Sequence, residues 1–169
     1  MGILSGNPQE EPLHYGEVFS LWEFVMVCNK TIVDHQMLLN HVGDGDLKKL
    51  LKEAIEQAQQ EVKQVSEVLK HNGVGLPPAA PEPPRVELDD IPVGARFQDA
   101  DVAAAASAKV AAGLIACSQI MGMSIREDIP MMFGQFHMNK ATLAGKFLKL
   151  TKEKGWLVPP PLHHSSKED

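Results

Sequence analysis

Four side chains of this sequence are of the types that hold metal ions in proteins. They are Cys28, Glu61, Cys117 and His137. Thiolate, carboxylate and imidazole groups together suit zinc in a tetrahedral site. When the helical repeat is counted along antiparallel segments, these residues fall at about one level. The sequence therefore allows a zinc or iron site at the centre of a helical bundle, and the alternative is two buried thiols and a buried histidine.

The sequence motifs give little support for catalytic chemistry. Ferritin-like proteins that bind two metals use Glu-x-x-His motifs on two of their helices. The helices expected below carry none, and their nearest approach, Glu67 with His71, is one residue too long. A glycine-rich phosphate loop, a nucleophile elbow and a Cys-x-x-Cys motif are also missing from the sequence. We therefore expect no enzymatic activity and predict no cofactor, with zinc or iron as the alternative.

Composition and charge argue against several classes of protein. The 169 residues are 44% hydrophobic, 22% charged and only 5% aromatic, which is typical of one folded domain built from helices. The formal net charge of −6 argues against a nucleic-acid or membrane partner. Two cysteines cannot form a disulfide framework, and residues 1–12 lack the pattern of a signal peptide. We expect a protein of the reducing cytoplasm.

Two helices are predicted in the first half of the chain. Apolar residues recur at spacings of three and four over residues 14–42 and again over 46–71. In the turn between them, Gly43 suits a left-handed helix end, and Asp44 or Asp46 can cap the next helix. Because the turn is short, the two helices should lie antiparallel.

A proline-rich crossover is predicted over residues 74–97, which cannot be helical. The preceding helix should be about 40 Å long, and an extended chain of this length exceeds that distance. The crossover can therefore run back along the molecule, so that the third helix starts beside the start of the second. The side chains expected to pin it to the helices are Leu88, Ile91, Val93 and Phe97.

Two more helices are predicted in the second half of the chain, over residues 99–123 and 126–154. Ser124 and Glu127 have the spacing of a capping box, and Lys140 is expected on the outer face of the last helix. We predict an all-α fold: a ferritin-like four-helix bundle with up-down-down-up order and one long crossover. Its parts are a polar head at 1–12, the bundle at 13–162 and a polar tail at 163–169.

The expected third helix has almost no charge. Lys109 is the only charged residue between Asp101 and Arg126, and alanine dominates the segment. A membrane span is one interpretation, but the segment is only weakly hydrophobic and lacks flanking aromatic and basic residues. We instead predict a homodimer, because small residues let helix backbones approach closely. The predicted interface residues are Ala104, Ala108, Ala112 and Ile115.

The sequence indicates two further features of the interior. His35 lies on the inward stripe of the first helix, level with Glu53 and Ser107. We expect its imidazole to form a hydrogen bond across the bundle, because buried polar groups are usually paired. A small-molecule pocket lined by methionine and alanine between the third and fourth helices is a further alternative function.

Six different short motifs lie within residues 13–162. They are YGEVFSLW at 15–22, HVGDGDL at 41–47, IPV at 91–93, FQDADV at 97–102, REDI at 126–129 and KGWL at 154–157. Together they resemble an uncharacterised family of endospore-forming bacteria, a domain of unknown function with a ferritin-like four-helix fold. Its members are often labelled spore-coat-like, through similarity to the coat F type of protein. The resemblance implies a structural or interaction protein of the spore or its coat, with spore-coat proteins as partners, and it supplies no catalytic residues.

Overall fold

Helices account for the regular structure of the described chain. The computed structural model describes residues 10–163, so most of the predicted polar head and tail, at 1–9 and 164–169, lies outside the described residues. The four long helices are α1 (Tyr15–Leu39), α2 (Gly45–His71), α3 (Asp99–Met123) and α4 (Asp128–Glu153). Two single-turn 3₁₀ helices lie in the crossover, η2 (Leu88–Asp90) and η3 (Val93–Ala95). Residues 10–163 contain no strand, which confirms the all-α prediction.

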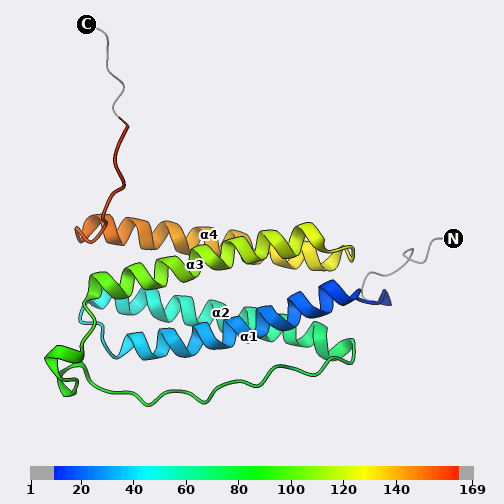
Figure 1. Ribbon diagram of the computed structural model, residues 1–169, viewed down its shortest axis with the longest axis horizontal. Helices are drawn as coiled ribbons and strands as arrows, with labels where there is room; N and C mark the ends of the chain where they lie inside the picture. The colour runs from blue at the N-terminus through cyan, green and yellow to red at the C-terminus, as the bar shows by residue number, and fades with distance from the viewer. Residues whose placement is uncertain (1–9, 164–169) are drawn as a thin grey trace, which may run out of the picture.

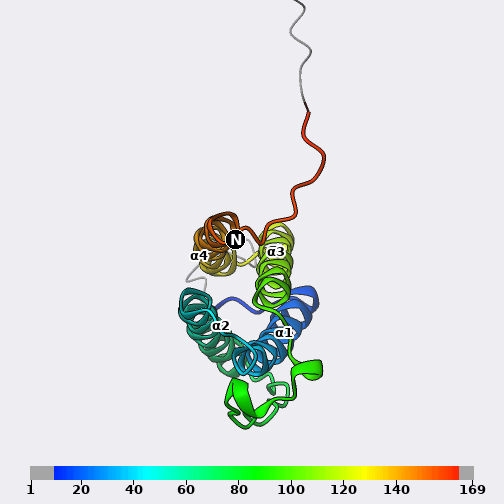
Figure 2. The ribbon, with the colours of Figure 1, turned by 90° about the vertical axis from the view of Figure 1, so that its left-hand side faces the viewer.

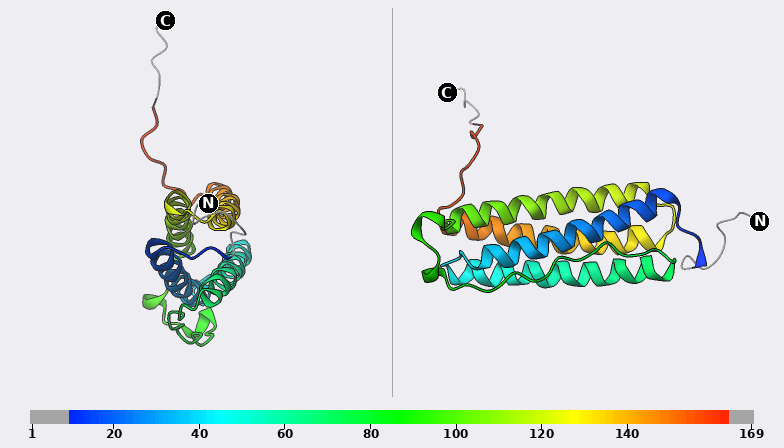
Figure 3. Two further views of the ribbon diagram at one scale, coloured as in Figure 1. Left: turned by 90° about the vertical axis from the view of Figure 1, so that its right-hand side faces the viewer. Right: turned by 60° about the horizontal axis from the view of Figure 1, so that its bottom comes forward.

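The long helices lie side by side as two antiparallel hairpins (Figure 1). One hairpin is formed by α1 and α2 and the other by α3 and α4, and most helix contacts lie within a hairpin. The crossover runs back along the outside of α1 and α2, so α3 points in the same direction as α2 (Figure 1, Figure 3). Seen along the helix axes, α3 lies beside α1 and α4 beside α2 (Figure 2).

Local sequence explains where the helices begin and end. The His14 side chain caps α1 by accepting hydrogen bonds from backbone amides of its first turn. Asp44 caps α2 in the same way, as one of the two predicted caps. Gly73 and Gly155 follow α2 and α4 with φ of 72° and 70°, the left-handed conformation that glycine adopts without strain.

Two predicted helix-end signals are wrong. Gly43 does not have a positive φ, because α1 ends at Leu39 rather than at residue 42 and the chain turns before the glycine. Ser124 does not cap α4, because its hydroxyl donates to a carbonyl in the last turn of α3 at 2.7 Å. The fourth helix begins at Asp128, without a side-chain cap from Glu127.

The interior consists of two apolar clusters, one toward each end of the helices. The cluster near the α1–α2 turn includes Val42, Leu51 and Phe147. The other cluster includes Phe24 and Phe133, whose ring centroids are 4.9 Å apart. Burying each large apolar side chain contributes roughly 1.5–3 kcal/mol to folding. Between the two clusters, α2 contributes the buried charged residue Glu61 beside the apolar Ile55 and Ala58, and α4 contributes the buried Lys140.

Several polar contacts hold the crossover to the first hairpin. The Asn40 amide nitrogen donates to the Pro84 carbonyl at 3.1 Å, and its oxygen accepts from the Val86 amide at 3.3 Å. Val93 and Phe97, predicted to pin the crossover, are 79% and 54% exposed. The prediction is wrong for Val93, which lies in the exposed turn η3. Phe97 does hold the crossover: its amide donates to His41 Nδ1 at 3.3 Å, and the two ring centroids are 4.9 Å apart. The other two predicted anchors, Leu88 and Ile91, are half-buried.

Candidate functional site

A buried ion pair lies at the centre of the four helices. The Lys140 ammonium nitrogen donates to Glu61 Oε2 at 2.7 Å, and Gln57 Nε2 donates to Glu61 Oε1 at 3.0 Å. Glu61 is 2% exposed and Lys140 is 9% exposed. Because removing charges from water costs several kcal/mol per ion, each of these charges depends on the other. The interior therefore carries a carboxylate whose cation is a lysine of the same chain.

Contacts with all four helices position the Lys140 side chain. It starts from α4 and passes Gly113 of α3, where a Cβ atom would lie 3.0 Å from Lys140 Cδ. Its nitrogen lies 5.9 Å from the centre of the Phe24 ring on α1 and meets Glu61 on α2. Glycine at position 113 thus provides the space through which the lysine crosses the interior.

The two cysteines lie close to this pair. Cys28 and Cys117 are both buried and free. Burial raises the pKa of the Cys28 thiol to about 12 and that of Cys117 to about 11, while nearby Lys140 opposes both shifts. The thiolate is the nucleophile and metal ligand, so thiols that stay protonated at neutral pH are poor in both roles.

The predicted metal ligands are not assembled into a metal centre. Within residues 10–163, no three His, Cys, Asp or Glu side chains are placed to hold an ion together. Glu61 is paired with Lys140 instead of with His137, which is half-buried on α4. The structure thus places Glu61 and the two cysteines near one another, and the cation that pairs with the Glu61 carboxylate is Lys140.

The placement of Lys140 contradicts the prediction that it faces solvent. It lies three residues before Leu143 and four after Phe136, and both neighbours are buried. Glu61 similarly follows Ala58 by three residues and precedes Val65 by four on the inner face of α2. The helical spacing therefore contained the signal for this buried ion pair, because Glu61 and Lys140 lie on the inward stripes of two different helices.

His35 is buried as predicted, but it lacks the predicted hydrogen bond. It is 2% exposed, and neither ring nitrogen has a hydrogen-bond partner among the described residues. The expected partners are engaged elsewhere: the Ser107 hydroxyl donates to the Ala103 carbonyl at 2.8 Å, and Glu53 pairs with Lys146. Burial lowers the pKa of His35 to about 4, so the imidazole is neutral at physiological pH.

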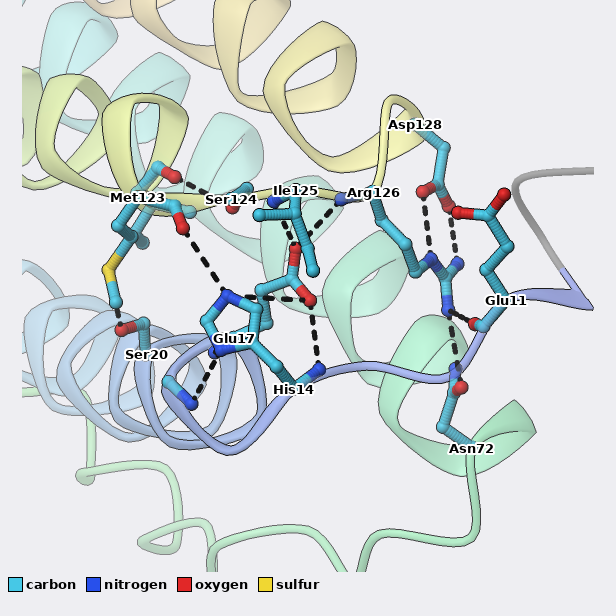
Figure 4. Close-up of polar contacts among 12 residues, drawn as sticks. Glu11, His14, Glu17, Ser20, Asn72, Met123, Ser124, Ile125, Arg126 and Asp128 are labelled. Atoms are coloured by element: carbon cyan, nitrogen blue, oxygen red, sulfur yellow. Dashed lines mark hydrogen bonds and ion pairs between the residues drawn. The ribbon is translucent and has the colours of Figure 1, made fainter. Parts of the chain in front are cut away.

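A second buried charge, Glu17, joins the start of α1 to the α3–α4 turn (Figure 4). Its Oε1 accepts hydrogen bonds from the amides of Ile125 at 2.8 Å and Arg126 at 3.0 Å. Its Oε2 accepts from the His14 amide at 3.0 Å. The carboxylate replaces the missing Ser124 cap by satisfying backbone amides that precede α4.

Arg126 completes this cluster from the other side (Figure 4). Its guanidinium forms two hydrogen bonds with Asp128, at 3.0 and 2.6 Å. It also donates to the Glu11 carbonyl at 3.1 Å and to Asn72 Oδ1 at 3.2 Å. Because Arg126 links the N-terminal segment, the end of α2 and the start of α4, the cluster acts as a structural clamp. Glu17 and Arg126 lie within two of the short family motifs, YGEVFSLW and REDI, but the motifs alone indicated no structural role for either residue.

The outer face of α3 is exposed and uncharged. Ala104, Ala108, Ala112 and Ile115 are all exposed, and the Ile115 side chain is 69% exposed. Lys109 is turned away toward α1, where it donates to Asp34 at 2.6 Å. By length and composition alone, the helical segment is apolar enough to cross a membrane, with a mean hydropathy of 1.5 over 18 residues. Only 28% of that window is buried, so the surface of α3 is unusually apolar for a helix in contact with water.

A cavity opens beside this helix, between α1 and α3. Its volume is about 340 Å³. Phe24, Cys28 and Lys140 line it, together with the small residues Gly113 and Ala116. The pocket considered from the sequence was placed between the third and fourth helices, and the structure places the cavity on the other side of α3.

Comparison with known proteins assigns the chain to a family. The family described as "Protein of unknown function (DUF3231)" matches residues 1–168. The chain belongs to the DUF3231 family. A DUF3231 relative in Bacillus subtilis (strain 168), the uncharacterised protein YvdQ, is 69% identical over 163 residues, which is 96% of each chain.

Solved structures agree with the helical fold of this DUF3231 chain. A crystal structure described as a "putative spore coat protein" from Bacillus halodurans C-125 is 57% identical, with a TM-score of 0.92 over 94% of this chain and 100% of that one. A conserved hypothetical protein of Mycobacterium tuberculosis has a TM-score of 0.65 at 17% identity, over 81% of this chain and 98% of that one, and shows the fold alone. The resemblance to an uncharacterised, spore-coat-like family is confirmed to this extent.

Proposed function

We propose that this DUF3231 protein is a non-enzymatic structural protein of the spore that forms a homodimer through the outer face of α3. The observation that carries the proposal is the exposed, uncharged surface formed by Ala104, Ala108, Ala112 and Ile115. Two copies of a face made of small residues can approach closely and bury it. The spore coat description of the Bacillus halodurans relative supports the cellular setting.

The absence of enzymatic activity and of a resident metal belongs to the same proposal. Its support is that the buried charges already have partners within the chain: Glu61 pairs with Lys140, Glu17 accepts hydrogen bonds from backbone amides, and the Arg126 guanidinium pairs with Asp128. The cysteine thiols near the centre are held protonated by burial, which suits packing rather than catalysis. We accordingly assign these groups to the stability and specificity of the fold.

The finer architecture is also part of the proposal. The parallel direction of α2 and α3, together with the long crossover between them, is the order of a ferritin-like bundle, up-down-down-up. We place the protein in the cytoplasm during synthesis and in the spore or its coat afterwards. Other spore-coat proteins are the partners proposed beyond the second copy.

The dimer is tested by placing a charge on the proposed interface. Ala108→Glu should convert a dimer to a monomer in sizing chromatography with light scattering, because the face would have to bury unpaired carboxylates. The matched control is Ala80→Glu, at an exposed position of the crossover, which should leave the dimer intact. A monomeric wild-type protein, or a dimer unaffected by Ala108→Glu, would refute the proposed interface.

A further inference from the structure

We infer that the cavity between α1 and α3 binds a small, neutral, mostly apolar molecule that carries one oxygen able to accept a hydrogen bond. The cavity volume of about 340 Å³ lies within the range of small-molecule sites in proteins. Its lining is mainly apolar, with the Lys140 side chain as the buried polar group. This inference concerns a ligand site and does not depend on the proposed dimer.

The cavity exists because small residues line the seam between the two hairpins. Gly113 and Ala116 of α3 and Ala58 of α2 line the cavity there, together with the exposed Ala112, which also belongs to the proposed dimer interface. Contacts between α1 and α3 are sparse compared with those inside each hairpin. Since Gly113 must stay small for Lys140 to pass, the chain cannot fill this space at that position without displacing the lysine.

The polar group in the cavity has hydrogen-bonding capacity to spare. An ammonium group has three N–H donors. Lys140 uses one on Glu61 at 2.7 Å, and its nitrogen lies 5.9 Å from the centre of the Phe24 ring. Among the described residues, no further acceptor forms a hydrogen bond with this nitrogen. An oxygen of a bound molecule would supply one, and the Phe24 ring and neighbouring alanines would contact its apolar part.

Charge balance around the cavity selects a neutral ligand over an anion. The two lysines that line it are already paired, Lys140 with Glu61 and Lys109 with Asp34. The exposed rim residue Glu23 adds a negative charge. Lys30 also pairs with Asp34, so the charges of these groups, with Glu23 included, cancel. A ligand carboxylate would therefore meet no excess positive charge to offset its loss of hydration, whereas an alcohol or ketone oxygen accepts a hydrogen bond without adding charge.

The test is a titration of the ¹⁵N-labelled full-length protein with benzyl alcohol and, in parallel, with toluene, which lacks the oxygen. We expect benzyl alcohol to shift the amide signals of α1 and α3 around Cys28 and Gly113. It should bind about tenfold more tightly than toluene, since it gains a hydrogen bond to a charged group. The Glu61→Leu/Lys140→Met double variant, which removes the pair as a unit, should abolish this difference.

Two variants test the location of the site. Ala116→Phe should fill the cavity and abolish the shifts, whereas Ala141→Phe, at an exposed position of α4 outside the cavity, should leave them unchanged. Circular dichroism and sizing chromatography of both variants separate loss of binding from loss of fold or of the dimer. Equal affinity for toluene, shifts confined to other surfaces, or binding that survives Ala116→Phe would overturn the inference. The inference would also be overturned if the monomeric Ala108→Glu variant bound benzyl alcohol and the wild type did not, because a second copy would then cover the cavity in the wild-type dimer.

Discussion

His35 lies on the inner face of α1 with both ring nitrogens unpaired among the described residues, and its charge state links stability to pH. Burial lowers its pKa from 6.5 to about 4, with Lys109 and Lys140 acting in the same direction and Asp34 opposing them. Between these pH values the unfolded chain binds a proton that the folded protein does not. The free energy of unfolding should therefore fall as the pH drops through this window, by about 3 kcal/mol in total.

Urea unfolding of wild type and His35→Leu, at about pH 7 and about pH 4.5, measures this contribution. The variant should lose clearly less stability on acidification than the wild type, because a leucine does not titrate. His71→Leu is the control, since His71 is exposed and should keep the wild-type dependence. Paired carboxylates such as Asp34 contribute equally to all three proteins. Identical acid sensitivity in His35→Leu and wild type would contradict the assignment.

The Glu61–Lys140 pair makes a second prediction for individual residues. Lys140→Met should destabilise the protein by about 3–5 kcal/mol, because it leaves Glu61 charged and buried without a cation. Adding Glu61→Leu should restore most of that loss, since two apolar groups need no partner. Denaturant unfolding of both single variants and the double variant gives the coupling energy. Additive losses would show that the two side chains act independently.

At the level of the helix, Gly113 of α3 leaves the space through which the Lys140 side chain passes. In an open helix interior, Gly→Ala stabilises by about 1 kcal/mol, and Gly145 of α4 has nothing within 4 Å of an added Cβ. At Gly113 the added Cβ would lie 3.0 Å from Lys140 Cδ, and the lysine is fixed at its other end by Glu61. Gly145→Ala should therefore raise the thermal midpoint, and Gly113→Ala should lower it. A stabilised Gly113→Ala variant would mean that the lysine moves aside freely.

The helices and several of the buried polar residues were predictable, but the pairing of the buried charges was not. The apolar repeat and the prolines of the crossover were sufficient to predict four helices and an all-α fold. The reason is that a helix with one buried face has apolar residues at spacings of three and four. Lys140 escaped prediction because a lysine is usually solvated, although its spacing from Phe136 and Leu143 is that of an inward residue. Glu17 escaped because its partners, Ile125 and Arg126, are more than a hundred residues away in sequence. Pairings across helices depend on packing that no single segment reveals.

For the molecule as a whole, the pairing of its interior charges predicts independence from metal ions. Elemental analysis after dialysis should find zinc and iron well below one per chain, and EDTA should leave the thermal midpoint unchanged. The reason is that Lys140 already neutralises the carboxylate at the centre and the thiols stay protonated. Stoichiometric metal that disappears in a Cys117→Ala/His137→Ala variant would instead restore the predicted metal site.

The proposed dimer through the outer face of α3 predicts that the stability of the molecule depends on protein concentration. If the folded protein is a dimer and the unfolded chain is a monomer, each tenfold rise in concentration adds about 1.4 kcal/mol to the free energy of unfolding per dimer. The denaturation midpoint of wild type and of Ala80→Glu should therefore rise with concentration. Ala108→Glu should have one midpoint at every concentration, because its face carries a charge that prevents burial. A wild-type midpoint that is equally constant would mean that Ile115 and its alanine neighbours face water in solution, and the proposed assembly would then need another surface.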